Sequence, residues 1–276
     1  MDGLLVAAAL LSAALHASWN AAVKASAQPT QAMTGQMLVS ALLALPVLGF
    51  TGLPDAAAAP WMLMSTTMNM GAVASLLRAY EHAGFGVAYP MVRASSVLLV
   101  LPLAAAVAGE WPHALALVGV LLVSAAVLLL ARGPKRALSR PALLWTAAGA
   151  AFTACYVVFD AQGVRRSGSP LAYGCVLAFC NGLLWTAWQW RRGLQLRSLL
   201  PGWPRTLAMS MAATLSYWLI LWVWTRAPIA PAAALRDTSA IFATLIAATV
   251  LKERIDARVI AAVLLATAGT VAIRLA

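Results

Sequence analysis

The sequence predicts an all-α polytopic membrane protein in which ten transmembrane helices form two inverted five-helix repeats. The first observation is composition: 63% of the 276 residues are hydrophobic and only 10% are charged, whereas about 25% of residues are charged in soluble domains. The second is a division of the chain into ten apolar runs, since about 20 apolar residues span a bilayer. The third is a sequence pattern that occurs twice, 143 residues apart.

The ten runs follow one another with short connections, so nothing remains for a soluble domain. The first is not a cleaved signal peptide, because no basic residue precedes it and polar residues interrupt it. The runs do not alternate with period two, as the strands of an outer-membrane barrel do. We expect helices at residues 3–24, 31–51, 60–79, 85–108, 112–131, 141–164, 169–190, 204–225, 229–250 and 256–274.

The repeated pattern relates residues 88–110 to residues 231–253. Each copy is an apolar run that begins near a proline, carries an arginine near its start and ends on a glutamate. The alignment pairs Arg93 with Arg236, Ser95 with Thr238, Ser96 with Ser239, and Glu110 with Glu253. We therefore expect two units, residues 1–133 and 141–276, joined by a basic, proline-bearing segment. Because five is an odd number, the second unit enters the membrane from the opposite side, as in many secondary transporters.

The net charge of +11 does not indicate nucleic-acid binding, because the basic residues lie between apolar runs. Thirteen lie in odd-numbered loops and four in even-numbered loops and the tail. The positive-inside rule then places the odd loops in the cytoplasm and both termini outside. The thirteen are Lys24, Arg78, Arg132, Lys135, Arg136, Arg140, Arg191, Arg192, Arg197, Arg205, Lys252, Arg254 and Arg258; the four are Arg165, Arg166, Arg226 and Arg274. A basic cytoplasmic rim also attracts anionic lipid headgroups.

Three segments give the chain a family resemblance. They are His16-Ala-Ser-Trp-Asn20, Tyr89-Pro-Met-Val-Arg93-Ala-Ser-Ser96 with Gly109-Glu110, and Ala234-Leu-Arg-Asp-Thr-Ser239 with Lys252-Glu253-Arg254. Each half resembles one EamA-type unit of the drug/metabolite transporter superfamily, and the whole chain resembles bacterial exporters of amino acids, including aromatic amino acids. The resemblance implies the cytoplasmic (inner) membrane of a bacterium, and a central cavity surrounded by helices 1, 3, 4, 6, 8 and 9.

Polar residues inside apolar runs are concentrated on those six helices, and such residues usually face the protein interior or a wet cavity. The helix at 112–131 and the helix at 256–274 are almost wholly Ala, Val, Leu and Gly, and we expect them to act in packing. The candidate substrate-binding residues are His16, Asn20, Tyr80, Tyr89, Arg93, Ser95, Tyr156, Asp160, Tyr217, Trp218, Arg236 and Ser239.

Several candidates have two interpretations. His16 and Asn20 either bond across helices or line the cavity. Arg93 and Arg236 either form salt bridges or snorkel to the interface, the favoured view, or contact an anionic substrate group. Asp160 either couples transport to protons or pairs with one of the two arginines.

Helix ends and prolines add three further expectations. The matched Glu110 and Glu253 are expected to cap the N-terminus of a neighbouring helix. Pro90 either bends its helix or lies in the first turn, and the same two interpretations apply to Pro231.

The sequence indicates a secondary transporter that exports small metabolites, namely amino acids with aromatic or apolar side chains and related compounds, by alternating access through a central cavity. The alternatives are an intramembrane enzyme or a channel-like pore. Catalysis is disfavoured because no HExxH or GxSxG motif occurs and intramembrane acids are few. The three cysteines match no metal or redox spacing. We therefore expect no enzyme activity, metal or cofactor, and a monomer whose partners are its small-molecule substrate and membrane lipids.

Overall fold

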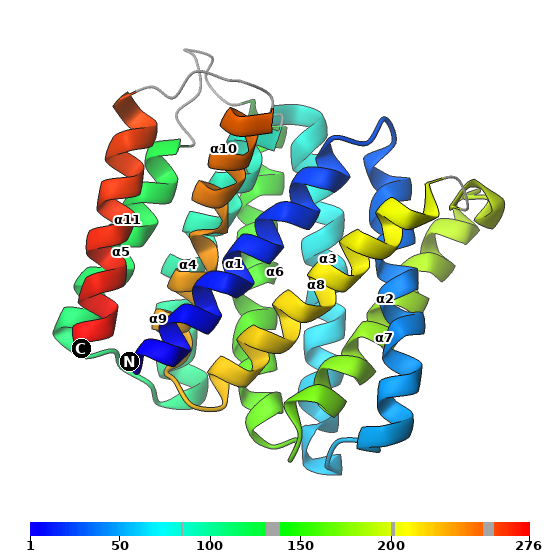
Figure 1. Ribbon diagram of the computed structural model, residues 1–276, viewed down its shortest axis with the longest axis horizontal. Helices are drawn as coiled ribbons and strands as arrows, with labels where there is room; N and C mark the ends of the chain where they lie inside the picture. Colours follow the sequence, from blue (N-terminus) through cyan, green and yellow to red (C-terminus); the bar gives the residue numbers. More distant parts are fainter. Residues whose placement is uncertain (84, 131–138, 200–201, 251–256) are drawn as a thin grey trace.

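The computed structural model describes residues 1–83, 85–130, 139–199, 202–250 and 257–276. Within them the chain forms eleven α-helices, two short 3-10 helices and no β-strand (Figure 1). The first half contains α1 (Gly3–Lys24), α2 (Pro29–Thr51), η1 (Ala56–Ala58), α3 (Ala59–Ala83), α4 (Phe85–Ala108) and α5 (Ala114–Leu130). The second contains α6 (Arg140–Arg165), α7 (Pro170–Arg191), η2 (Leu196–Leu199), α8 (Trp203–Trp224), α9 (Ile229–Asp237), α10 (Ser239–Val250) and α11 (Ala257–Leu275).

Most of these helices have the length and apolarity needed to cross a membrane. In the described residues, eight segments qualify by length and composition, and α9 with the start of α10 counts as one of them. The shorter apolar helix α5 has 17 residues, and the 25-residue α3 is absent from the eight because it carries more polar side chains. The helical segments therefore follow the expected runs, and the total of ten transmembrane helices stays a prediction beside the eight segments that qualify among the described residues.

The run expected at 229–250 forms two helices, α9 and α10, because the α-helical register is interrupted at Thr238 between them. The backbone N–H of Thr238 donates to the carbonyl of Leu235, three residues back, and its hydroxyl donates to the same oxygen at 2.6 Å. A hydroxyl that bonds a local carbonyl competes with the helical ladder, which explains the break.

The two prolines that stand at nearly matching places in the two halves, Pro90 and Pro231, do not cause such an interruption. Pro231 is the third residue of α9, so the first-turn interpretation applies to it. Pro90 lies six residues into α4, and that helix continues past it to Ala108. Neither proline interrupts its helix.

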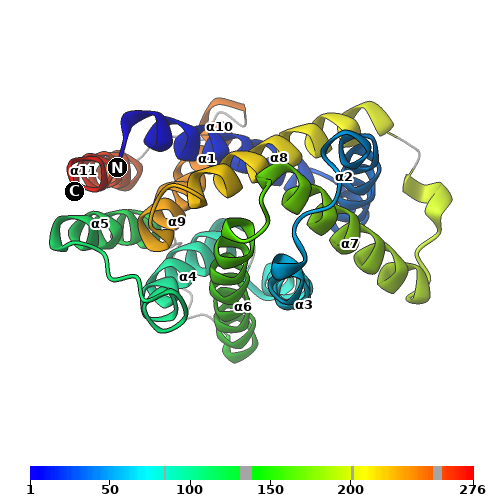
Figure 2. The same cartoon turned by 90° about the horizontal axis from the view of Figure 1, so that it is seen from below.

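The helices form two layers that cross the whole molecule. Viewed from below, α1 and α8 lie on one side, and α3, α4 and α6 lie on the other (Figure 2). The principal contacts pair α1 with α8, α3 with α6, α2 with α7, and α5 with α11, and α9 packs on α4 and α5. Both chain termini lie at one end of the bundle, opposite the end where α5 and α10 finish (Figure 1).

Close contact between helices depends on small residues at two of these pairs. A Cβ atom at Gly119 of α5 would lie 2.7 Å from the carbonyl oxygen of Gly269 of α11, and the reverse distance is also 2.7 Å. A Cβ atom at Gly182 of α7 would collide with the carbonyl of Met37 on α2. Small residues let backbones approach where lipid supplies no hydrophobic driving force.

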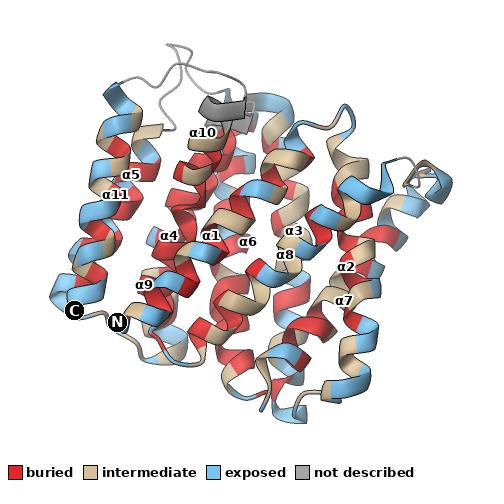
Figure 3. Cartoon of the chain, in the orientation of Figure 1, coloured by how far each residue is buried: buried red, intermediate tan, exposed pale blue. Residues whose placement is uncertain are grey.

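The centre of the bundle is built around α9 and its neighbours. Buried residues cover α4, α6 and α9, while the outward faces of α2 and α11 are exposed (Figure 3). The span Ile229–Ile246 has 78% of its residues buried, against 28% for Ala257–Leu275. The polar residues of α9 are therefore held inside protein, not against lipid.

Candidate functional site

A central cavity of about 180 Å³ lies between the two layers and receives side chains from both halves of the chain. Its walls come from α1, α2, α3 and α4 and from α6, α7, α8 and α9, and no described residue of α5, α10 or α11 lines it. The lining residues with polar or aromatic side chains are His16, Trp19, Asn20, Gln36, Ser40, Asn69, Tyr89, Arg93, Thr153, Tyr156, Asn181, Thr214, Tyr217 and Arg236.

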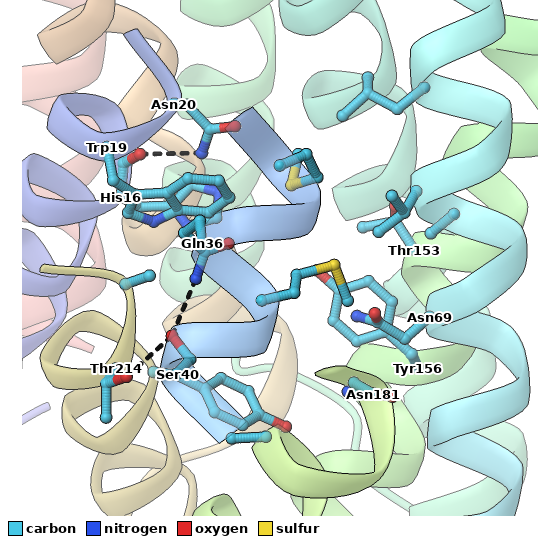
Figure 4. Close-up of a pocket in the computed structure, with 18 of the residues that line it drawn as sticks. His16, Trp19, Asn20, Gln36, Ser40, Asn69, Thr153, Tyr156, Asn181 and Thr214 are labelled. Atoms are coloured by element: carbon cyan, nitrogen blue, oxygen red, sulfur yellow. Dashed lines mark hydrogen bonds between the residues drawn. The ribbon is translucent and has the colours of Figure 1, made fainter. Parts of the chain in front are cut away.

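One wall of the cavity is a hydrogen-bonded set from α1, α2 and α8 (Figure 4). The amide nitrogen of Asn20 donates to the carbonyl of His16 at 2.8 Å, so these residues bond along their own helix. Gln36 Nε2 donates to Ser40 Oγ at 2.9 Å, and Thr214 Oγ1 donates to the same oxygen at 3.2 Å. These bonds fix the wall while leaving polar groups directed at the cavity.

The facing wall comes from α3, α6 and α7, with Asn69, Thr153, Tyr156 and Asn181 (Figure 4). The amide oxygen of Asn181 is buried and has no hydrogen-bond partner among the described residues. The same holds for the indole N–H of Trp19 on the opposite wall. Buried polar groups are normally bonded, so a bound molecule with a donor and an acceptor would satisfy both.

Arg93 and Asp237 form a buried ion pair that links α4 to α9. Each residue is 5% exposed. The hydroxyl of Ser96, also on α4, lies 3.3 Å from Oδ2 of Asp237. The salt-bridge interpretation of Arg93 is therefore confirmed.

Arg236 occupies the matching position of the repeat but has no such partner. It is 5% exposed and lines the cavity, and its Nε and Nη1 atoms donate a hydrogen bond to no described residue. Its guanidinium carbon lies 6.0 Å from the ring centre of Tyr217. The repeat explains the difference, because Asp237 corresponds to Ala94 in the first copy. The two copies therefore contain two arginines but only one adjacent acid, Asp237, and this acid pairs with Arg93.

Asp160 is buried beside the cavity without lining it. Its carboxylate accepts hydrogen bonds from Ser65, from Tyr217 at 2.6 Å and from Tyr173 at 3.3 Å. These donors lie on α3, α8 and α7, so the carboxylate joins four helices. Of the two alternatives for Asp160, the ion pair with Arg93 or Arg236 does not occur among the described residues, and the proton-coupling role stays a prediction.

A second polar junction lies at the end of the bundle that holds the termini. Glu110 pairs with Arg165 at the end of α6, and its other oxygen accepts from the backbone N–H of Ile229, the first residue of α9, at 2.7 Å. Arg165 also donates to the carbonyls of Trp224 and Ala227 at 2.8 and 2.9 Å. The expectation that Glu110 caps a neighbouring helix is confirmed, whereas Glu253 lies outside the described residues.

The structure places the twelve sequence-predicted residues in two groups. Seven line the cavity, namely His16, Asn20, Tyr89, Arg93, Tyr156, Tyr217 and Arg236. The other five do not: Tyr80 and Ser95 are half-buried elsewhere, Asp160 lies behind Tyr217, Ser239 lies 3.1 Å from the Tyr89 hydroxyl, and the Trp218 indole packs on Gly174 of α7.

Sequence reasoning missed the contribution of α2 and α7. Gln36 and Asn181 are side-chain amides within apolar runs, and that signal would have identified both helices. The same signal would have identified Asn69, whereas the residue types of Trp19 and Thr214 alone do not separate them from ordinary packing residues.

Residues 140–275 match the model of the EamA-like transporter family, and no curated protein matches the chain. Among solved structures 27 chains match. One, described only as the crystal structure of a protein, has a TM-score of 0.79 and 15% identity over 99% of this chain and 96% of that chain. That likeness shows the fold alone. The chain is thus a multi-pass membrane protein whose residues 140–275 are similar to the EamA-like transporter family.

Proposed function

We propose that this protein is a secondary transporter of the bacterial inner membrane that exports small metabolites, namely amino acids with aromatic or apolar side chains and related compounds. The observation that carries the proposal is the cavity between membrane-length helices, which contains buried polar groups with no bond to any described residue. Its volume of about 180 Å³ is below the about 300–1,000 Å³ of clefts for drug-sized ligands. A small polar metabolite fits that size and chemistry.

Alternating access is the proposed mechanism, with residues 1–133 and 141–276 as the two repeats. Exchanging the halves converts the α1–α8 pair into the α6–α3 pair, and both pairs make principal contacts. The α2–α7 and α5–α11 pairs are each converted into themselves. This pattern supports two units related by a two-fold axis, around which a central site opens to either side in turn.

The two ends of the cavity differ in a way that fits this mechanism. We propose that the junction of Glu110 and Arg165, which lies at the end that holds the termini, closes the cavity at that end. The cavity residues of α4, Tyr89 to Arg93, lie near the start of that helix and hence toward the opposite end. With the orientation proposed from the basic loops, the structure corresponds to a state directed toward the cytoplasm.

The orientation predicts the accessibility of Ser139. A cysteine at this position, which precedes α6, should resist a membrane-impermeant thiol reagent in intact cells, because the basic segment is cytoplasmic. A cysteine at His113, an exposed residue of the connection before α5, should react readily under the same conditions. The reverse labelling pattern would place the termini in the cytoplasm.

The cavity predicts different consequences for two aromatic substitutions. Tyr156→Ala removes part of the cavity wall and should weaken substrate binding by about 1 kcal/mol or more if stacking contributes, with near-normal folding. Trp218→Ala removes a half-buried indole that packs on Gly174, and it should lower stability by about 1–3 kcal/mol.

The measurement is uptake of labelled amino acids into proteoliposomes, beside the thermal stability of each detergent-solubilised variant. Val123→Ala on the buried face of α5 is the control, because it lies outside the cavity. Parental uptake kinetics for Tyr156→Ala, measured below saturation, would remove this residue from the proposed site. An absence of uptake for the whole panel by the parental protein would contradict the proposed substrates.

A further inference from the structure

We infer that Arg236 is the anion-binding residue of the cavity, and that the ligand is a small monocarboxylate whose carboxylate bonds to this guanidinium. The inference rests on the proposed role of the cavity as the transport site, and it adds the charged group by which the ligand is recognised. It assigns different roles to Arg93 and Arg236, which the repeated sequence makes equivalent.

The burial of Arg236 carries the first step. Its guanidinium has five N–H donors, and a buried charge is costly unless it is paired and hydrogen-bonded. The residue is 5% exposed, and its Nε and Nη1 atoms have no partner among the described residues. The Tyr217 ring and the C-terminal turn of α9 provide favourable electrostatics, but neither replaces an acceptor that meets the guanidinium fork.

The neighbouring acids carry the second step, since each is already occupied. Asp237 pairs with Arg93 and lies within hydrogen-bonding distance of Ser96. Asp160 accepts from Ser65, Tyr173 and Tyr217. No Asp or Glu appears among the described residues that line the cavity. The acceptor for Arg236 is therefore a group that the ligand brings.

The charge balance selects the class of anion. Arginine forms bidentate bonds with both carboxylates and phosphates. One uncommitted guanidinium supplies a single positive charge, because Asp237 neutralises Arg93. A single carboxylate group is matched by that charge, whereas a phosphate dianion would retain an uncompensated negative charge in a buried site. The remaining polar lining consists of amide, hydroxyl, indole and imidazole groups.

The test compares carboxylates with their amides in the full-length protein. Labelled L-phenylalanine, L-leucine and L-threonine are offered to proteoliposomes, with the corresponding amino-acid amides as competitors. The parental protein should prefer the carboxylate over the amide at least tenfold. Arg236→Gln should raise the KM for the carboxylate at least tenfold and bring the preference close to one, and Arg236→Lys should retain part of it.

A binding measurement covers the case in which Arg236→Gln does not fold. The thermal shift that L-phenylalanine produces in the parental protein should exceed the shift that its amide produces at the same concentration. Equal inhibition by acids and amides, equal thermal shifts, or unchanged selectivity in folded Arg236→Gln would overturn the role of Arg236 while leaving transport intact. If the parental protein took up none of the compounds, this result would instead contradict the proposed function and the inference with it.

Discussion

Asp237→Ala should lower the free energy of unfolding by about 3–5 kcal/mol, because it leaves Arg93 as an unpaired buried charge. The side chains of both partners are 6% exposed, so solvent screens the pair little. The loss should be large for a second reason. Arg236 is next to Asp237 in sequence and pairs with no acid among the described residues, so the substitution leaves two buried guanidinium groups without a nearby negative charge at this position. Asp237 thus holds together a region that contains two guanidinium groups.

The double variant Arg93→Met/Asp237→Leu separates the cost of an orphaned charge from the value of the pair. Replacing a buried pair by apolar residues of similar volume is often neutral or stabilising, so the double variant should be more stable than Asp237→Ala. Unfolding in mixed detergent micelles measures the difference. If the free energy of unfolding of Asp237→Ala lay within about 1 kcal/mol of the parental value, the pair would not be required for stability.

Glu110→Gln should shift the protein toward a state that is open at the end with the termini. The change removes the ion pair with Arg165 and weakens the cap on α9. A hydrogen bond to a charged group contributes about 1.5–3 kcal/mol, and every 1.4 kcal/mol corresponds to about a tenfold change in an equilibrium ratio. If alternating access requires this junction to open, the closed state should lose about one order of magnitude in relative population.

Labelling of a cavity cysteine from the side of the termini measures that shift. Ala213→Cys places a thiol on the half-buried α8 wall, in a background where Cys155, Cys175 and Cys180 are alanine. Glu81→Gln is a matched control, because Glu81 pairs with Arg78 at the surface, with side chains 57% and 47% exposed, and such pairs contribute little. Identical labelling rates in the Glu110 and Glu81 variants would show that the junction does not hold this end closed.

The sequence could predict the helices because each depends on a local property, an apolar run of sufficient length. It could not predict the interruption at Thr238. That interruption arises because the Thr238 hydroxyl donates to the carbonyl of Leu235 in its own helix, and the sequence does not show whether a hydroxyl bonds its own helix, solvent or another helix. The sequence also could not fully distinguish the polar and aromatic residues that line the cavity from those that pack elsewhere. His16 and Tyr156 line the cavity and Trp218 does not, because the face that an aromatic residue presents depends on the packing of helices far apart in the sequence.

The two arginines show the same limit more sharply. The repeat gives Arg93 and Arg236 equivalent positions, and either could have formed a salt bridge. The decisive residue is Asp237, which follows Arg236 in sequence but pairs with Arg93 from the other half. Only the packing of α4 against α9 determines this choice. The contribution of Gln36 and Asn181, in contrast, was open to detection, since side-chain amides in apolar runs are costly without a partner.

Reversible blocking of the cavity tests the central proposal most directly. The Ala213→Cys protein, in the background without the three native cysteines, is reconstituted and treated with a methanethiosulfonate reagent that adds a bulky group to the thiol. Uptake of the amino acid that the parental protein transports should stop after modification and return after reduction. Leu144 lies on the outer face of α6 and is 61% exposed, so the Leu144→Cys protein should retain uptake throughout. Full uptake by completely modified Ala213→Cys protein would contradict transport through this cavity.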